Sequence, residues 1–150
     1  AEDKRYQATV RLGSSTDTYD AEGTPSGPEV PVNVEKEQFA ELLTHFVGEI
    51  EQKPPAYSAI RVQGQRAYDM ARRGEEVDLA PRIITVHSLD LLEWAPPEAV
   101  VDVHCSSGTY VRSLAHDIGE ELGVGGHLVG LRRTRSGRFT LRDAVSLRRS

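Results

Sequence analysis

Hydrophobic and polar positions alternate strictly over residues 5–12, close to the start of the chain. A period of two predicts a β-strand with one buried face. The hydrophobic face would carry Tyr6, Ala8, Val10 and Leu12. Because the alternation begins so near the first residue, we expect partner strands of the same sheet to lie upstream of it.

Two longer segments show the helical period instead. Over residues 34–50, hydrophobic positions recur three and four residues apart, which predicts an amphipathic helix packed on the core, with Asn33 as its N-cap. A second stripe predicts a helix from Tyr110 to Leu122, ended by Gly123. The core face of the first helix would hold Phe39, Leu42, Leu43, Phe46, Val47 and Ile50.

The rest of the pattern is mostly that of strands, turns and loops. Further strands are expected at 58–62, at 82–94 and 99–105 around a Pro96-Pro97 turn, and within 127–140 on both sides of Ser136-Gly137; short helices are expected at Arg66–Arg73 and from about Leu141, and a long loop at 13–31. Strands outnumber helices, and few connections resemble βαβ crossovers. The predicted class is therefore α+β, with a mixed, largely antiparallel sheet flanked by helices, in one domain of 150 residues.

Composition narrows the functional classes. With 38% hydrophobic and 27% charged residues, the chain is typical of a soluble globular protein, and no apolar run reaches the roughly 20 residues of a membrane-spanning helix. The single cysteine excludes an internal disulfide and favours a reducing compartment, so we expect a cytoplasmic protein. The histidines show no paired ligand spacing, and the acidic segment 16–23 lacks the calcium-loop pattern, so no metal is expected. Turn chemistry explains the Asp and Thr residues of that segment instead.

Charge is distributed unevenly along the chain. Residues 1–111 hold 10 basic and 19 acidic side chains, a net charge of −9, whereas residues 112–150 hold 8 arginines and 4 acids, a net charge of +4. Arginine recurs through the segment Leu131–Phe139, with small polar residues between. This pattern fits a strand that binds RNA phosphates, and it fits equally well an edge strand protected by charge. Both interpretations stay open at this point.

One segment combines an aromatic ring and a permanent positive charge where a strand gives way to a helix. Within residues 105–114, Tyr110 offers a face for stacking, and Arg112 offers a planar guanidinium that fits a carboxylate or a phosphate. Arg112 lies outside the hydrophobic stripe of the predicted helix. We therefore expect a polar site at this junction.

Four segments of the sequence, taken together, form a signature. They are Lys4-Arg5-Tyr6 with Gly13-Ser14-Ser15-Thr16-Asp17-Thr18-Tyr19-Asp20; Gln52-Lys53-Pro54-Pro55-Ala56-Tyr57; Cys105-Ser106-Ser107-Gly108-Thr109-Tyr110-Val111-Arg112; and Gly126-His127 with Leu131-Arg132-Arg133-Thr134. In their order and spacing, these segments resemble the bacterial tRNA pseudouridine synthase family TruB. The resemblance runs from about residue 4 to about residue 147.

The resemblance implies an activity and a set of site residues. Family members detach a uracil in the T-loop of tRNA from its ribose, rotate it and rejoin it through C5, without a cofactor, after the nucleotide has left the stack. Tyr6 would stack on the uracil, and Arg112 would pair with a catalytic aspartate. Substrate contacts are implied for Asp17, Tyr110, Leu131 and Arg132. For Tyr6 and Leu131, packing in the core is the competing explanation, because both fall on hydrophobic faces.

The family's nucleophile lies in a Gly-Thr-Leu-Asp-Pro motif, which this sequence does not contain. Asp17 and Asp20 belong to a different family motif and are not expected to replace it. The resemblance therefore implies part of a pseudouridine synthase catalytic domain, without the nucleophile segment and without the family's C-terminal RNA-binding PUA domain. We expect the chain alone to be inactive, to bind a tRNA T-stem-loop, and to self-associate through an exposed sheet edge. The alternatives are a non-catalytic RNA-binding module and a relative that works with guide RNAs.

Overall fold

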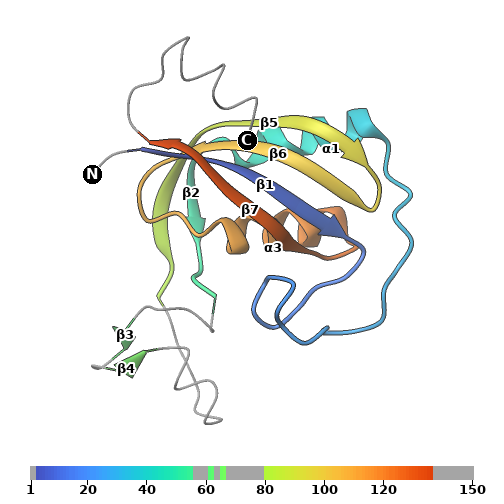
Figure 1. Cartoon of the computed structure of the whole chain (residues 1–150), viewed down its shortest axis with the longest axis horizontal. Coiled ribbons are helices and arrows are strands. Elements are labelled where there is room, and N and C mark those ends of the chain that lie inside the picture. The colour runs from blue at the N-terminus through green and yellow to red at the C-terminus, as the bar shows by residue number, and fades with distance from the viewer. Residues whose placement is uncertain (1–2, 56–60, 63–64, 67–79, 137–150) are drawn as a thin grey trace.

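A five-stranded sheet forms the centre of the protein, as the computed structural model in Figure 1 shows. The structure describes residues 3–55, 61–62, 65–66 and 80–136. The strands follow the order β2-β5-β6-β1-β7, and every pair of neighbours is antiparallel. Their bounds are β1 Lys4–Leu12, β2 Gly48–Gln52, β5 Arg82–Ala95, β6 Glu98–Cys105 and β7 Gly126–Ser136, and a separate ribbon pairs β3 Arg61–Val62 with β4 Gln65–Arg66.

Helices contribute to the core on one face of the sheet. These are α1 (Lys36–Leu43), continued by the 3₁₀ turn η1 (Thr44–Phe46), and α3 (Val111–Leu122). Alternate residues of β1 and β6, including Ala8, Val10 and Val103, pack with Leu114 and Ile118 of α3 in one cluster. The opposite face carries polar pairs: Arg5 makes a bidentate contact with Asp102, at 2.8 and 3.2 Å. Within the described residues, the apolar face of the five-stranded sheet thus lies under α1 and α3.

The predicted class and most predicted elements are confirmed. The fold is α+β, and the strands expected at 5–12, 82–94 and 99–105 are β1, β5 and β6. The helix expected from Tyr110 is α3, with Tyr110 as its N-cap. Gly123 ends it in the left-handed region at a φ of 82°, as expected of a C-cap glycine. The long loop between β1 and α1 is also as expected, and it adds an isolated parallel bridge between Asp20 and Leu128.

The helix predicted over residues 34–50 is confirmed up to Phe46, and the prediction was wrong beyond that residue. Helical structure ends at Phe46, and residues 48–52 form the edge strand β2, where Ile50 pairs with Ile84. The change of structure falls at Gly48, whose φ of +110° is a conformation that ends a helix and that glycine tolerates. Asn33 was also wrong as the N-cap, because Glu35 holds that position, without a side-chain capping bond.

Several other predictions fall wholly or partly outside the described residues. Arg66, expected to begin a helix, lies in strand β4, whereas the remainder of that helix, most of the strand at 58–62 and everything after Ser136 are outside them. Within the described ranges, β7 is one continuous strand up to Ser136. None of the helices in these ranges is long and apolar enough to cross a membrane.

Candidate active site

The start of α3 is fixed by a side chain from the neighbouring edge strand. Gln52, at the end of β2, is 1% exposed. Its Oε1 accepts the Tyr110 backbone N–H at 2.8 Å, and its Nε2 donates to the Tyr110 carbonyl at 3.0 Å. One residue further, the Lys53 carbonyl accepts a hydrogen bond from Ser113 Oγ at 2.9 Å. The Gln52-Lys53 segment therefore holds the first turn of α3 and, with it, both side chains predicted from the junction.

Tyr110 presents its ring beside a cation. The Arg82 guanidinium carbon lies 5.6 Å from the centroid of the Tyr110 ring, within the range of a cation–π contact. Tyr110 itself is half-buried, and Arg82 is exposed at the start of β5. The ring that was predicted to line a base pocket thus lies at a partly open, positively charged edge.

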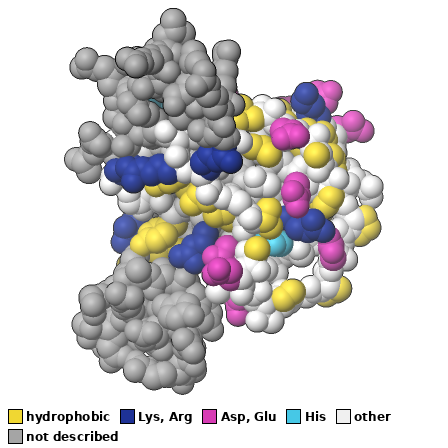
Figure 2. All heavy atoms as spheres, viewed as in Figure 1, with side chains coloured by type: hydrophobic (Ala, Val, Ile, Leu, Met, Phe, Trp, Pro, Cys, Tyr) yellow, Lys and Arg dark blue, Asp and Glu magenta, His cyan; other side chains and the backbone are white. Residues whose placement is uncertain are grey.

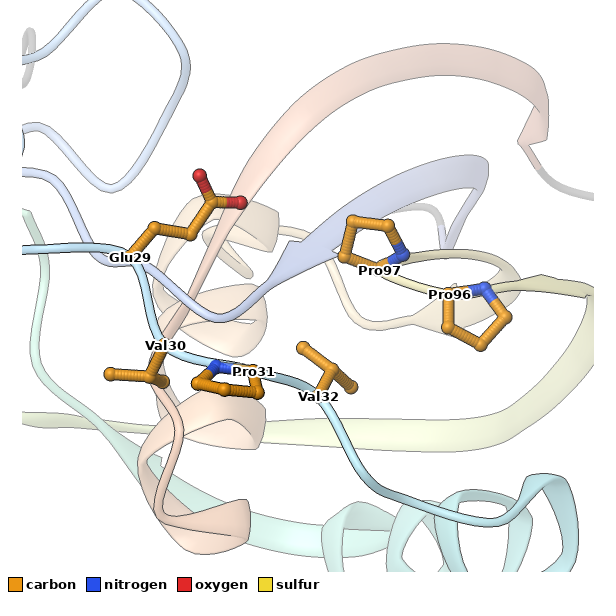
Figure 3. Close-up of a pocket in the computed structure, with 6 residues that line it drawn as sticks. All are labelled: Glu29, Val30, Pro31, Val32, Pro96 and Pro97. Carbon is orange, nitrogen blue, oxygen red and sulfur yellow. The ribbon is translucent and has the colours of Figure 1, made fainter.

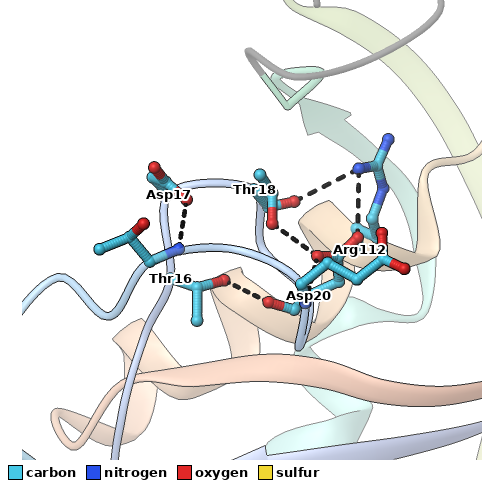
Figure 4. Close-up of polar contacts among 7 residues, drawn as sticks. Thr16, Asp17, Thr18, Asp20 and Arg112 are labelled. Atoms are coloured by element: carbon cyan, nitrogen blue, oxygen red, sulfur yellow. Dashed lines mark hydrogen bonds and ion pairs between the residues drawn. The ribbon is translucent and has the colours of Figure 1, made fainter. Parts of the chain in front are cut away.

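Arg112 reaches from α3 to the loop that follows β1, as Figure 4 shows. Its Nη1 lies 3.4 Å from the Thr18 carbonyl and 3.4 Å from Asp20 Oδ2. The Arg112 side chain is 26% exposed, so the guanidinium is partly shielded from water. Both contacts are longer than the 2.7–2.9 Å usual for a charge-assisted hydrogen bond. The loop therefore orients the guanidinium without forming a tight ion pair with it.

Asp20 is held by several donors and is not presented as a nucleophile. Its Oδ1 accepts hydrogen bonds from Thr18 Oγ1 at 2.5 Å and from the Glu22 N–H at 3.1 Å, while its Oδ2 faces Arg112. Asp17 closes the same loop by accepting the Thr24 N–H at 2.8 Å. Turn chemistry, predicted for this acidic segment, is confirmed. A contact between Asp17 and the substrate stays a prediction.

Tyr19 anchors this loop against the two elements beneath it. The Tyr19 ring stacks on His116 of α3, with centroids 3.9 Å apart and an interplanar angle of 8°. Its carbonyl accepts the Leu128 N–H of β7 at 2.9 Å. Arg112 and His116 lie four residues apart, on the same side of α3. The stacking of Tyr19 on His116 therefore places the flanking residues of the loop, Thr18 and Asp20, beside Arg112.

Tyr6 lies on the sheet face that α3 covers, at the end where α3 begins. It pairs with Val103, two residues before the end of β6, and packs partly buried against the core. Burial raises the pKa of the Tyr6 phenol, the Cys105 thiol adds to the increase, and Arg133 opposes it. The raised pKa keeps the hydroxyl protonated at neutral pH, so Tyr6 can donate a hydrogen bond or stack as a neutral ring. Core packing, the competing explanation, accounts for part of its surface only.

Leu131 is on the same face and is not a core residue. It pairs with Ala8 across β1 and β7, yet it is 50% exposed. Core packing therefore does not explain this leucine, and its place lining a base pocket stays a prediction. Arg132, the next residue, pairs with Gln7 and is exposed on the opposite face, away from Tyr6. The structure thus places Tyr6 and Leu131 on the sheet face that α3 covers, Tyr110 and Arg112 at the start of α3, and Arg132 on the other face of the sheet.

Positive charge gathers at this end of the molecule. Figure 2 shows Lys and Arg side chains concentrated where β7 ends and α3 begins, whereas basic and acidic side chains alternate at the other end. Arg82, Arg132 and Arg133 are all exposed, and Arg112 is partly so. The chain as a whole has a net negative charge, so it is the fold that gathers these arginines in one region of the surface.

Sequence reasoning missed Gln52, Asp20 and Arg133 as parts of the site. Gln52 carried an indirect signal, because the next residue, Lys53, precedes two prolines, and the residue before a proline is held extended. Asp20 was seen only as a member of a loop motif. Arg133 was in view, but nothing in the sequence told which of two adjacent arginines faces Tyr6.

Two other features do not contribute to the site. Cys105 is 0% exposed and burial raises the pKa of its thiol, while His104 lies on the opposite face near Asp3, so the two do not form a nucleophilic pair. The described residues contain no group of three or more His, Cys, Asp or Glu side chains that could hold a metal ion. A groove of about 410 Å³ lies between the segment Glu29–Val32 and the Pro96-Pro97 turn, and none of the predicted site residues lines it (Figure 3).

Comparisons with solved structures identify the same fold in larger proteins. "Crystal Structure of a Cbf5-Nop10-Gar1 Complex" contains a chain that matches 93% of this one with a TM-score of 0.64 and 29% identity. "Structure of H/ACA RNP bound to a substrate RNA containing 2'-deoxyuridine" gives a TM-score of 0.59 and 27% identity over the same share. This chain covers 32% and 30% of those two chains.

Sequence comparisons find relatives with higher identity to this chain. Proteins named tRNA pseudouridine synthase B are 49% identical over 148 residues in Corynebacterium efficiens, 50% over 145 in Aromatoleum aromaticum and 46% over 142 in Bacteroides fragilis. They match 96%, 97% and 95% of this chain, which spans 50%, 47% and 61% of their lengths.

Two family profiles match almost the entire sequence. The profile described as TruB family pseudouridylate synthase (N terminal domain) matches residues 1–111, and the tRNA pseudouridylate synthase B C-terminal domain matches residues 112–149. The boundary between them falls at the start of α3, and the sheet takes strands from both regions, since β7 pairs with β1. The chain therefore belongs to the TruB family of pseudouridine synthases.

Proposed function

We propose that this chain serves the conversion of uridine to pseudouridine in the T-loop of tRNA. The observation that carries the proposal is the placement of Arg112: a partly shielded guanidinium in the first turn of α3, the helix that Tyr110 caps, oriented by Asp20 of the loop after β1. A permanent cation in partial shelter suits a partner carboxylate, because an opposite charge lowers the pKa of a carboxyl group and keeps it ionised.

The reaction rearranges bonds within one nucleotide. The N1–C1′ bond breaks, a C5–C1′ bond forms, C5 loses its proton and N1 gains one. The atoms and electrons balance without an oxidant or a reductant, so the proposal includes no cofactor. Tyr6 would stack on the extruded uracil as a neutral phenol, with Tyr110 and Leu131 as further walls of the base pocket and Asp17 in the loop near the nucleotide.

The proposal assigns the nucleophilic carboxylate to a residue outside this sequence. Asp17 and Asp20 are committed to loop hydrogen bonds, and the sequence has no Gly-Thr-Leu-Asp-Pro motif. Arg112 would hold the ionised carboxylate toward C1′, and Asp20 would hold Arg112. Residues 1–150 would then form one partial catalytic domain, inactive alone, in a cytoplasmic enzyme. Self-association through an edge strand, β2 or β7 in the described sheet, stays a prediction that sedimentation can test.

A bacterial-type tRNA enzyme is favoured over a guide-RNA-dependent one by degree of similarity. Identity is 46–50% to the bacterial relatives and 26–29% to the chains of the Cbf5 complexes. A non-catalytic RNA-binding module would keep the basic end of the molecule but would not need the positioning of Arg112. Activity measurements on Arg112 variants separate these alternatives.

The test uses the full-length gene product and a tRNA carrying tritium at C5 of its uridines, because pseudouridine formation releases that proton. We expect Arg112→Lys to lower the single-turnover rate by about 100- to 1000-fold, the cost typical of removing one preorganised electrostatic contact. Its tRNA affinity should stay close to that of the wild type. The matched control is Arg11→Lys, at the far end of β1, which should retain the wild-type rate. An unreduced rate in Arg112→Lys, or release of tritium by the 150-residue chain alone, would contradict the assignment of roles.

A further inference from the structure

The edge strand β7 changes its alternation twice along its length. Its pairing with β1 is irregular between Thr9 and Val10, where Val129 has no partner, and again between Arg5 and Tyr6, where Thr134 has none. An extra residue of this kind is a β-bulge, and it reverses which face the following side chains take. Before the first bulge, Leu128 pairs with Val10 on the core face.

The bulge at Val129 decides which arginine of β7 lies beside Tyr6. Between the two bulges the pairs are Ala8 with Leu131, Gln7 with Arg132 and Tyr6 with Arg133. Directly paired residues of an antiparallel ladder point to the same face, with Cβ atoms about 5 Å apart. Arg133 is therefore the cross-strand neighbour of Tyr6, whereas Arg132 is on the other face with Gln7.

Arg133 is also exposed to solvent at this position. Its side chain is exposed, and Leu131, two residues away on the same face, is 50% exposed. The charge of Arg133 is felt at the Tyr6 phenol, whose pKa it lowers against the effect of burial. An exposed guanidinium fork next to an aromatic ring combines a phosphate-binding group with a base-stacking surface.

We propose that Arg133, and not Arg132, binds an RNA backbone phosphate that flanks the uridine stacked on Tyr6, and that it thereby positions this nucleotide. This inference rests on the proposed function. In an RNA chain, each nucleotide has a backbone phosphate on either side of its ribose. A side chain as long as that of arginine can reach from the neighbouring strand past the edge of the Tyr6 ring. Arg132 can add to RNA affinity only from the opposite face, where it cannot hold the reacting nucleotide.

The experiment combines protein variants with an RNA in which one phosphate has lost its charge. The full-length gene product is titrated with T-stem-loop RNAs carrying a neutral methylphosphonate linkage on the 5′ or the 3′ side of the target uridine, and with the unmodified RNA. Arg133→Ala should lose about five- to ten-fold in affinity for the unmodified RNA, with the salt dependence shallower by about 0.7–0.9 per lost phosphate contact. Arg133→Lys should retain most of the salt dependence.

The decisive result is whether the two losses add. With one of the two neutral linkages, the wild type should lose as much affinity as Arg133→Ala does, and Arg133→Ala should lose nothing further. Arg132→Ala should still show the full loss caused by that linkage, because its own contact lies elsewhere. The single-turnover rate should fall more in Arg133→Ala than in Arg132→Ala. In a Tyr6→Phe background, Arg133→Ala should still make the salt dependence shallower.

Three outcomes would count against the inference. The assignment is overturned if Arg133→Ala and both neutral linkages act additively, or if Arg132→Ala shows the non-additive behaviour. It is also overturned if the effect of Arg133→Ala disappears with the Tyr6 hydroxyl, because Arg133 would then act only on that phenol. Failure of the proposed function gives a different result: the wild-type gene product would neither bind the unmodified RNA nor release tritium from it.

Discussion

Gln52 offers the sharpest test of how the fold positions the site, through the variant Gln52→Met. Methionine has nearly the same length and flexibility, so it fills the same buried volume without a polar end group. The substitution removes both hydrogen bonds to the backbone of Tyr110, the N-cap of α3. It leaves the hydrogen bond between Ser113 and the Lys53 carbonyl in place.

The magnitude follows from what each Tyr110 group loses. The Tyr110 N–H loses the acceptor that the structure gives it, and a buried donor left without a partner costs about 1–3 kcal/mol. The Tyr110 carbonyl keeps the Leu114 N–H, at 3.1 Å, so its loss is only the net value of one hydrogen bond, about 0.5–1.5 kcal/mol. Methionine recovers part of this through its apolar contacts, which gives an expected destabilisation of about 2–3 kcal/mol.

Urea unfolding of the 150-residue chain measures this loss. With an m-value of about 2 kcal/mol/M, the midpoint should fall by about 1–1.5 M. The control is Gln52→Glu, which keeps an acceptor for the Tyr110 N–H but faces the Tyr110 carbonyl with a carboxylate oxygen. It should be destabilised at neutral pH and recover at acidic pH, where the protonated carboxyl group can donate to that carbonyl. A Gln52→Met variant within about 0.5 kcal/mol of the wild type would refute the reasoning, since it would mean that α3 does not depend on Gln52.

Two further substitutions in α3 test its packing and its electrostatics. A Cβ at Gly119 would lie 2.1 Å from the Gly126 backbone nitrogen, so Gly119→Ala should lower the free energy of unfolding by about 1–3 kcal/mol. The control is Gly27→Ala, whose added Cβ would meet nothing within 4 Å and which should change this free energy by less than about 0.5 kcal/mol. Equal urea midpoints for the two variants would contradict the close approach of Gly119 to Gly126. Burial raises the pKa of Asp117, with Glu120 adding to the increase and His116 opposing it, so the folded chain binds this proton more tightly than the unfolded chain. The stability that this proton contributes is therefore complete below the ordinary pKa and is lost as the pH rises through the raised one. Asp117→Asn should accordingly gain stability relative to the wild type, measured by urea unfolding, as the pH rises from about 3 to about 7. A difference in stability that does not change with pH would contradict this prediction.

The fold was largely predictable because local pattern and tertiary structure agree over most of the chain. The alternation of β1 and the stripe of α3 each match one buried face, and Gly123 ends α3 as its position predicts. The exception is the end of the predicted helix, residues 48–50, where the apolar spacing fits a helix but the chain forms β2. There Gly48 interrupts the helix, and Ile50 finds its partner in Ile84, more than 30 residues away in sequence. A pattern limited to near neighbours does not contain that pairing.

The sequence identified the residue types of the candidate site but not the contacts that position them. Tyr6, Tyr110 and Arg112 were identified through motifs, because an aromatic ring and a guanidinium carry recognisable chemistry. The contacts that place Tyr110 and Arg112 come from Gln52, at the end of a neighbouring strand, and from Asp20, in a loop. Gln52 lies 58 residues from Tyr110, and Asp20 lies 92 residues from Arg112, so a pattern of neighbouring residues does not reveal either contact.

The two adjacent arginines of β7, Arg132 and Arg133, show where sequence reasoning reaches its limit. Residues 132 and 133 have the same side chain, the same exposure class and adjacent positions, and strand alternation requires only that they take opposite faces. Which of them lies beside Tyr6 depends on whether an odd or an even number of extra residues precedes them in the strand. A single bulge at Val129 reverses the answer that regular alternation from Leu128 would give. The orientation of a functional side chain on this edge strand is therefore set by a bulge that the sequence pattern does not reveal. The register of the strand has to be known before either arginine can be given a role.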